Sequence, residues 1–411
     1  MPTVIIVGSG LVGAATALAF HQVGIKCTLY DQVNPVEAVM DGRAIEFGAS
    51  GGCVSIQAGG LRVLKTLGLL DECIEKGQPH PYLSFSKING SSQIVADART
   101  SNKKAGETDP KLQTPLQILR STLHNILMRA CHRVGIKTLI NKKLLDIKQN
   151  SDSVTVTFVD GTEATADLLI GADGIHSATR RKVFGDNLVA KFTGEMGHIG
   201  VVNIKEHNIT IKEADKASFY VDRDNKRFLA IFQASEDTAA VRVSTFDDPE
   251  VEDQSYRPVS DLPKEAGRLA DLLHEWGVPD YIEKMMRNSF RISAASIYDL
   301  PDLETYRKNR VILIGDAAHG MVPNAGIGLL TGLEDVGTLL AIMLERGTAA
   351  ANQARNLRVK GMAASPIFGG SLNHFIFRGV AALNNAGLFT LYTLFDCEAE
   401  VAKLIQEQES K

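Results

Sequence analysis

The hydrophobic pattern at the start of the chain predicts a strand, a helix and a second strand. The apolar run VIIV ends in glycines, and an Ala-rich stretch of helical character continues to Gly24. A second apolar run then ends at Asp31. Strand, helix and strand in this order form a βαβ unit, whose strands pair in parallel. We therefore expect the chain to open with an α/β domain.

Two later segments have the same character. Apolar residues at helical spacing predict a helix that Ser121 caps and Gly135 ends. The run VILIGDAAH, which follows Arg310, predicts a buried strand that leads into a loop, and residues 329–344 predict a largely apolar helix. Both segments match the first domain, so we expect that domain to be discontinuous.

Alternating segments in the middle of the chain predict antiparallel strands instead. The dipeptides Asn89-Gly90 and Asp160-Gly161 adjoin runs of alternating apolar and polar residues, and such dipeptides form tight hairpin turns. Another hairpin pattern spans SFYVDRDNKRFLAIFQA, within a largely strand-like region from about residue 192 to 249 that lacks intervening helices. We expect a separate, sheet-based domain there.

These patterns together predict an α/β fold. It consists of a Rossmann-like, doubly wound nucleotide-binding domain, a mostly antiparallel β-sheet substrate domain inserted into it, and C-terminal helices. The first domain is assigned residues 1–75, 101–185 and 290–365, and the substrate domain residues 76–100 and 186–289. Residues 366–411 are assigned to a C-terminal helical segment.

Composition and charge narrow the functional class. The 411 residues are 44% hydrophobic and 22% charged, as in ordinary globular proteins, and the net charge of -4 gives no positive field for a nucleic acid. Five scattered cysteines without a C-x-x-C pair, and no secretory signal at the N-terminus, predict a cytoplasmic protein. Polar residues interrupt the apolar stretch at 375–395, so we expect a buried or dimer-contact helix there rather than membrane association.

A glycine motif supplies the first candidate site. Gly8-x-Gly10-x-x-Gly13 follows the first strand and opens a helix, so its backbone can approach a pyrophosphate closely. Asp31, at the end of the second strand, is placed to accept hydrogen bonds from ribose hydroxyls and to repel a 2′-phosphate. The motif predicts dinucleotide binding, with a structural glycine turn as the alternative, and does not separate NAD from FAD.

Two further motifs make that separation. Asp316 ends a buried strand and is followed by Pro323, Gly326 and Gly328 before a helix, whose N-terminus can stabilise negative charge on a reduced flavin. The second motif, D-G-x-x-S-x-x-R from Asp173 to Arg180, also follows a strand.

With these three motifs in this order, the sequence resembles the single-component FAD-dependent monooxygenases of the para-hydroxybenzoate hydroxylase type, which include salicylate, urate and tetracycline hydroxylases. The resemblance implies FAD extended across the first domain, with its adenosine end at the glycine motif and its ribityl-diphosphate region at Asp316. It also implies NADPH or NADH as transient electron donor, and molecular oxygen and a small, aromatic or conjugated organic molecule as substrates. The cofactor-binding residues that it implies are Gly8, Gly10, Gly13, Asp31, Arg43, Arg120, Asp173, Asp316 and Gly328.

In this family one oxygen atom reaches the substrate through a flavin hydroperoxide, in a pocket that excludes water. The sequence departs from the family where G-Q-G-x-N is usual, since Ile327 and Leu330 replace both amides. We expect this loss to make substrate control of flavin reduction less strict. The alternatives to a monooxygenase are a flavin dehydrogenase or reductase without oxygen transfer, and a non-catalytic flavin-bound scaffold.

No catalytic residue and no metal ligand are assigned. Tyr220, His198 and Arg242 are candidates for a general base by location alone, with ordinary sheet residues as the alternative. We expect His319 to hydrogen-bond its own loop, and the Arg180-Arg181-Lys182 run to lie on a solvated helix face. Cys53 is expected to be a buried, inert thiol. Aromatic residues of the middle sheet are interpreted as pocket lining or as core: Phe219, Phe228, Phe232 and Phe246.

Overall fold

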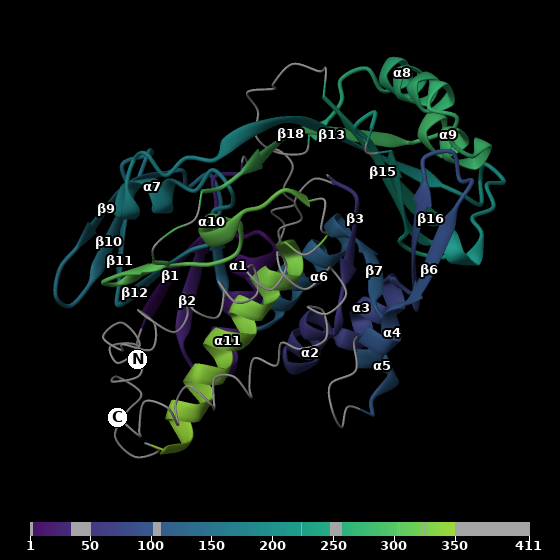
Figure 1. Cartoon of the computed structure of the whole chain (residues 1–411). Helices are drawn as coiled ribbons and strands as arrows, with labels where there is room; N and C mark the ends of the chain where they lie inside the picture. Colours follow the sequence, from purple (N-terminus) through teal and green to yellow (C-terminus); the bar gives the residue numbers. More distant parts are fainter. Residues whose placement is uncertain are drawn as a thin grey trace.

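The computed structural model describes residues 3–33, 51–101, 108–222, 224–246, 257–301, 303, 305–323, 326 and 328–349. Its architecture is the expected α/β fold, a Rossmann-like domain with an inserted, mostly antiparallel sheet (Figure 1). The described part of the chain holds no helix that is both long and apolar enough to cross a membrane. The domain boundaries, and the helical segment at 366–411, stay predictions.

A six-stranded sheet forms the centre of the first domain, in the order β19-β20-β12-β1-β2-β8. β1 pairs in parallel with β2 and β12, and β12 pairs in parallel with β20. The strands are β1 (Thr3–Val7), β2 (Lys26–Tyr30), β8 (Lys137–Leu139), β12 (Leu168–Gly171), β19 (Arg307–Lys308) and β20 (Val311–Leu313). The strand after residue 310 therefore joins a sheet begun at residue 3, as the discontinuous pattern predicted.

Helices pack beside this sheet and form the main apolar core. α1 (Leu11–Gln22) contacts α6 (Arg120–Arg133) and α11 (Gly328–Ala349), which crosses the lower half of Figure 1. α6 begins at Arg120, not after Ser121, because the extended residue Leu119 is its N-cap. The end of α6 is as predicted, with Gly135 at a φ of 77°. The other helices here are α2 (Ala58–Thr66), α3 (Leu70–Lys76), α5 (Pro110–Gln113), α7 (Ala178–Phe184) and α10 (Asp316–His319).

Two small sheets complete this half. The predicted turn at Asp160-Gly161 joins β10 (Val154–Phe158) to β11 (Glu163–Ala166), and β9 (Leu144–Gln149) pairs with β10. In the other sheet β7 (Leu116–Leu119) pairs with β3 (Cys53–Ile56) and β4 (Gln78–Pro79). This last sheet faces the inserted domain, since β3 and β7 both contact β15.

The inserted domain is an eight-stranded sheet in the order β17-β18-β13-β16-β15-β14-β5-β6. Asn89-Gly90 turns between β5 and β6, and the pattern SFYVDRDNKRFLAIFQA forms the β14–β15 hairpin, both as predicted. The strands are β5 (Tyr82–Lys87), β6 (Gln93–Asp97), β13 (Lys191–Asn203), β14 (Ala217–Asp222), β15 (Arg227–Gln233), β16 (Thr238–Thr245), β17 (Arg257–Pro258) and β18 (Arg291–Asp299). The remaining short pieces are α4 (Ala98–Ser101) and η2 (Glu213–Asp215).

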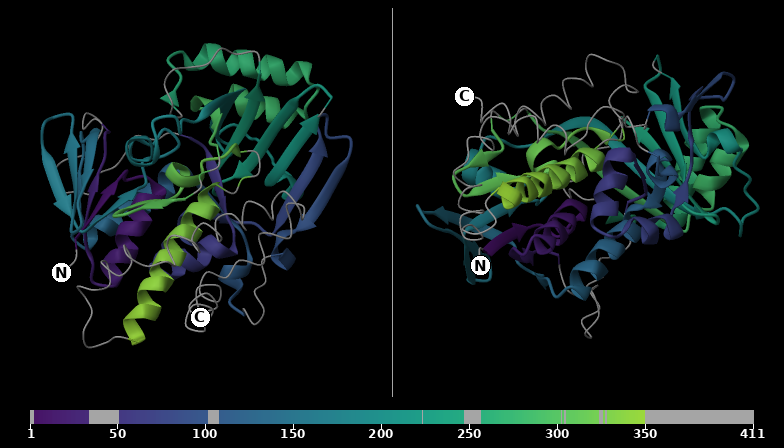
Figure 2. Two further views of the ribbon diagram at one scale, coloured as in Figure 1. Left: turned by 60° about the vertical axis from the view of Figure 1, so that its left-hand side comes forward. Right: turned by 90° about the horizontal axis from the view of Figure 1, so that it is seen from below.

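Two helices cover one face of this sheet. α8 (Leu262–Glu275) starts where the Asp261 carboxylate accepts a hydrogen bond from the Lys264 N–H. Together with α9 (Asp280–Arg287) it buries alternate sheet residues such as Leu229 and Val241, which are 0% exposed. In both views of Figure 2, as in Figure 1, these helices lie on the far side of the sheet from α11.

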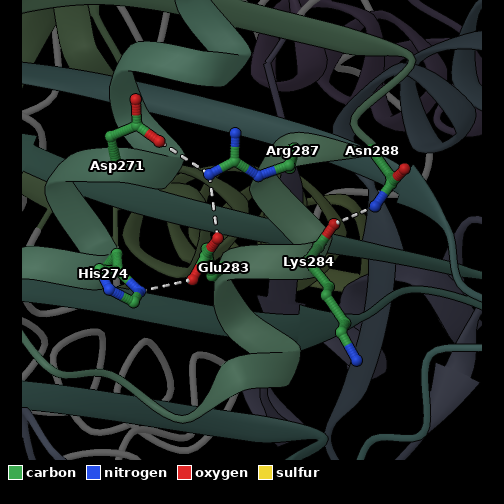
Figure 3. Close-up of polar contacts among 6 residues, drawn as sticks. All are labelled: Asp271, His274, Glu283, Lys284, Arg287 and Asn288. Atoms are coloured by element: carbon green, nitrogen blue, oxygen red, sulfur yellow. Dashed lines mark hydrogen bonds and ion pairs between the residues drawn. The ribbon is translucent and has the colours of Figure 1, made fainter.

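Polar contacts between side chains join α8 to α9 (Figure 3). The Arg287 guanidinium donates to Asp271 of α8 at 2.8 Å and to Glu283 of its own helix at 2.9 Å. His274 of α8 contacts the same Glu283 at 3.1 Å. Because α8 and α9 occupy this face, the opposite face of the sheet, which we call the inner face, is the one that meets the six-stranded domain.

Candidate functional site

Four loops with chemically active residues meet at one edge of the six-stranded sheet. Gly8 follows β1, Asp31 follows β2, Asp173 follows β12 and Asp316 follows β20. These strands are neighbours and parallel, so their carboxyl ends share an edge. In open α/β sheets ligands bind at this edge. The structure therefore brings together three motifs that lie more than a hundred residues apart.

The three motif glycines have different surroundings. A Cβ atom on Gly13 would lie 2.0 Å from the Gly8 carbonyl oxygen, and a Cβ on Gly8 would lie 2.3 Å from the Ala172 carbonyl oxygen. A Cβ on Gly10 meets no protein atom within 4 Å. Gly8 and Gly13 are thus required by packing within the protein. Gly10 borders an open cradle of the kind that a pyrophosphate needs for close approach.

The N-terminus of α1 opens onto this cradle. Its N-cap is Gly10, no side chain caps it, and its first turn holds no acidic residue. The first N–H groups of a helix carry a partial positive charge and favour an anionic ligand. The residues present therefore fit the diphosphate of FAD.

Asp31 makes hydrogen bonds that the sequence did not suggest. One carboxylate oxygen accepts from the backbone N–H and the hydroxyl of Ser9, both at 2.7 Å, and the other accepts from the Val33 N–H at 2.9 Å. His124 of α6 lies 2.7 Å from the Ser9 carbonyl oxygen through its Nε2 atom. Asp31 and His124 thus hold the glycine turn from two sides. A ribose contact of Asp31 stays a prediction.

Arg120 lies one helical turn before His124 on the same side of α6, near enough for its charge to act on the His124 ring. Burial lowers the pKa of His124, and the charge of Arg120 lowers it further. The Arg120 N–H donates to the Gly52 carbonyl at 2.8 Å, which joins α6 to the start of β3. Arg43 lies outside the described residues.

Asp173 uses both carboxylate oxygens within its own loop. It accepts from the Ser177 hydroxyl at 2.6 Å and from the N–H and hydroxyl of Thr179 at 2.9 and 3.0 Å. Burial nevertheless raises the pKa of Asp173, because the charged form is the one that desolvation disfavours. The geometry gives Asp173 a part in shaping the loop beside Gly8, and its contact with a cofactor stays a prediction.

The expectation of a solvated face for Arg180 was wrong. Arg180 is 0% exposed, and burial lowers its pKa to about 10. Its guanidinium donates to the Leu188 carbonyl at 2.9 Å and to the Ala317 carbonyl at 3.0 Å. The long side chain therefore ties the loop after β12 to the loop after β20, which no charge pattern along the chain could reveal.

Asp316 is exposed, although the three residues that follow it are buried. It begins the four-residue helix α10, whose other residues Ala317, Ala318 and His319 are buried. A Cβ on Gly328, the first residue of α11, would lie 3.9 Å from an Asp316 carboxylate oxygen, so these two predicted site residues are neighbours. An exposed carboxylate at the sheet edge matches the hydroxyl-rich ribityl chain of FAD.

We expected the His319 ring to hydrogen-bond its own loop, but the ring bonds a residue of another helix instead. Its Nε2 atom lies 2.7 Å from a carboxylate oxygen of Asp335 on α11. Asp335 is a site residue that sequence reasoning missed. The signal was the acidic pair Glu334-Asp335 within a largely apolar stretch of α11. No group of His, Cys, Asp and Glu side chains suited to a metal ion occurs among the described residues.

The candidates on the middle sheet divide between its two faces. Tyr220 faces the core under α8 and α9 and bonds the Tyr281 hydroxyl at 2.8 Å, and His198 pairs with Glu265 of α8 at 3.3 Å. Arg242, two residues from Ala240 on β16, instead points to the inner face, where Ala240 packs near Cys53 and Leu119. Alternation along the strands therefore places Tyr220 and His198 on the face that α8 and α9 cover, and Arg242 on the inner face.

The Cys53 thiol lies where β3 meets the inserted sheet. It is half-buried, and desolvation raises its pKa well above the ordinary value. A thiol that resists ionisation is a poor nucleophile. Cys53 is thus half-buried where a buried thiol was expected, and its inertness stays a prediction.

The chain is similar to known proteins in both sequence and fold. The family described as FAD binding domain matches residues 1–356. The FAD-dependent urate hydroxylase of Mycolicibacterium vanbaalenii is 29% identical over 342 residues, which cover 81% of this chain and 77% of that protein. The salicylate hydroxylase of Pseudomonas putida is 32% identical over 231 residues, which cover 53% of this chain and 52% of that protein.

Solved structures share the fold. CtdE in complex with FAD and its substrate has a TM-score of 0.75 at 20% identity, over 100% of both chains. Klebsiella pneumoniae HpxO with FAD and uric acid has a TM-score of 0.69 at 19% identity, over 100% of this chain and 93% of that chain. At these identities the likeness concerns the fold alone.

Proposed function

The chain belongs to the FAD binding domain family, and from that membership we propose that it is an FAD-dependent monooxygenase that uses NADPH or NADH to hydroxylate or epoxidise a small aromatic or conjugated molecule. The curated relatives named above are hydroxylases that match most or about half of this chain. FAD supplies the two-electron chemistry and the activation of oxygen when it is bound. One oxygen atom enters the substrate, the other leaves as water, and NAD(P)H provides the electron pair.

We assign FAD to the edge where the four loops meet. Gly10 and the N-terminus of α1 would hold the diphosphate, Asp31 and Arg120 would hold the adenosine end, and Asp316 and Gly328 would hold the ribityl chain. The support for this placement is the open space at Gly10 together with the exposed Asp316 carboxylate. Gly8, Gly13 and Asp173 contribute by holding the loops close together.

A cluster of aromatic side chains on the inner face supports an aromatic substrate. Phe85 and Phe219 stack with ring centroids 5.4 Å apart, and Phe219 contacts Phe228 at 6.0 Å and Phe232 at 5.7 Å. All four rings are half-buried, whereas their strand neighbours on the covered face, such as Leu229 and Ile231, are fully buried. Large apolar rings that stay partly accessible are suited to stack against a flat ligand.

Arg242 adds a polar group beside this cluster. It donates to Glu195 at 2.6 Å, and Ser244 donates to the same carboxylate oxygen at 2.6 Å. The Arg242 guanidinium also lies 5.3 Å from the centroid of the Phe228 ring. Both members of the ion pair are nearly buried, so the guanidinium is held in place beside the aromatic rings. We propose that Arg242 orients an oxygen-bearing substituent of the substrate, such as a phenol, carbonyl or carboxylate.

The test of function measures oxygen transfer directly. Purified protein reconstituted with FAD is incubated with NADPH or NADH and a panel of phenols and larger conjugated rings under ¹⁸O₂. We expect ligand-stimulated NAD(P)H oxidation and a product heavier by one labelled oxygen atom. Oxidation without incorporation of label would support a dehydrogenase or reductase. FAD binding without stimulated oxidation by any ligand would support a non-catalytic scaffold.

A substitution on each face of the inserted sheet tests the substrate position. We expect Arg242→Gln to raise KM about tenfold or more for a substrate with an oxygen substituent, because it removes a charge-assisted hydrogen bond of about 1.5–3 kcal/mol. Its FAD content should be unchanged. The matched control is Arg268→Gln on α8, which pairs with Glu265 away from the inner face. Equal KM values in the two variants would contradict the assignment.

A further inference from the structure

We propose that Asp335, a residue of α11, is a positioning residue that sets the Asp316 turn for FAD. The proposal rests on the FAD placement given above and concerns cofactor binding alone. The turn in question is α10, a four-residue helix that starts at Asp316 and ends at His319. So short a helix is not stable by itself, and its position depends on what holds it.

One oxygen atom of Asp335 holds both ends of this turn. It accepts from the Gly315 N–H at 2.8 Å, just before Asp316, and it lies 2.7 Å from Nε2 of His319, the last residue of the turn. Gly315 is the N-cap, has a φ of 56°, and gives the helix no side-chain cap. Asp335 therefore ties the residue before α10 and the last residue of α10 to the same point on α11. Fixing both ends leaves Asp316, which lies between them, little freedom to move.

The contacts between Asp335 and the turn are buried, so little water is present to replace them. Asp335 and His319 are each 4% exposed in their side chains. Burial by itself lowers the pKa of His319, but the charge and hydrogen bond of Asp335 outweigh it and raise the pKa above its ordinary value. A buried pair of this kind tolerates little displacement, because separating the partners leaves buried polar groups without a hydrogen bond.

Two neighbouring contacts restrict the turn further. Arg180 of α7 donates a hydrogen bond from its guanidinium to the Ala317 carbonyl oxygen, over 3.0 Å. α11 itself sits close, since a Cβ on Gly332 would lie 2.5 Å from a methyl carbon of Val12 and 3.5 Å from the Gly315 Cα. The position of Asp335 is thereby tied to α1 and the glycine turn, so the two ends of the FAD site share one rigid support.

The test is a double-mutant cycle on FAD affinity. FAD is titrated onto the deflavinated full-length chain carrying Asp335→Asn, Asp316→Ala or both, without NAD(P)H, oxygen turnover or substrate. We expect Asp335→Asn to weaken FAD binding about tenfold, and to weaken it much less when Asp316 is already alanine, because residues that act as one unit are non-additive. The unfolding midpoint of each deflavinated variant is measured in parallel.

Two further variants make the result decisive. His319→Gln keeps a hydrogen-bond donor toward Asp335, so this variant should fold even if Asp335→Asn does not. Its FAD affinity should also fall, but by less than that of Asp335→Asn. Glu334→Gln is the matched control on the adjacent residue. Burial raises the pKa of the native Glu334 carboxyl to about 8, so the glutamine amide resembles the protonated side chain. The Glu334 side chain faces Gly59 of α2.

The outcomes separate positioning from general stability. Unchanged FAD affinity in Asp335→Asn and His319→Gln with a lowered unfolding midpoint would overturn the proposal, and so would losses that add fully to that of Asp316→Ala. An equal loss of affinity in Glu334→Gln would also overturn it. Because no turnover is measured, failure of the monooxygenase assignment leaves the result of this cycle unaffected.

Discussion

Alanine at Gly10 should leave the protein folded but unable to hold FAD, whereas alanine at Gly13 should destabilise the protein itself. The two glycines lie in the same motif and differ in what surrounds them. The Gly10 Cβ would enter open space, and its φ of -62° is one that alanine adopts readily. The Gly13 Cβ would lie 2.0 Å from the Gly8 carbonyl oxygen, which is backbone and cannot rotate away.

The expected sizes follow from these surroundings. Gly13→Ala must push α1 away from the glycine turn, at a cost of about 1–3 kcal/mol or more in the free energy of unfolding. Gly10→Ala has no such cost, and we expect it to weaken FAD binding at least about hundredfold, since the methyl group occupies the space of the diphosphate.

Urea unfolding of the deflavinated variants and FAD titration measure the two effects separately. Native FAD affinity in Gly10→Ala would show that the cradle is not the diphosphate site. Native stability in Gly13→Ala would show that α1 and the turn are less tightly packed than the structure implies.

The second large effect is expected at Asp316. Asp316→Ala should weaken FAD binding about tenfold to hundredfold, the equivalent of about 1.5–3 kcal/mol for hydrogen bonds to a charged group. The fold should be little affected, because Asp316 is exposed while the rest of α10 is buried. Asp316→Asn should lose less, because the amide keeps one acceptor oxygen.

Asp224→Ala is the control for this experiment. It removes another exposed aspartate, in the turn between β14 and β15 of the other sheet, and should leave the FAD dissociation constant unchanged. If Asp316→Ala in a folded protein bound FAD as tightly as this control, the ribityl chain would have to lie elsewhere.

Much of the fold follows from short-range patterns. The strand, glycine turn and helix from residue 3 to Gln22, the hairpins at Asn89-Gly90 and Asp160-Gly161, and the helix that begins at Gly328 were all predictable. Each depends on hydrophobic periodicity or on a backbone conformation that particular residues favour locally. The family resemblance rests on the same kind of local motif, which is why the membership could be inferred without coordinates.

The roles of the charged side chains could not be read in this way. Arg180 has the composition of a solvated helix face yet is fully buried, because its carbonyl partner Ala317 lies 137 residues away. Asp31 and Ser9 bond across the turn of a βαβ unit, and Asp335 reaches back to Gly315. A side chain's partner depends on which loops share a sheet edge, and periodicity carries no information about that.

The sequence by itself determined most of the elements, the family and the motifs that meet at the edge of the six-stranded sheet, because these depend on patterns within a few residues of each other. The tertiary structure alone decided which face of the inserted sheet is available, since α8 and α9 cover Tyr220 and His198 and leave Arg242 and the phenylalanine cluster on the inner face. Strand alternation divides residues into two sets, but only the packing of distant helices chooses which set is covered.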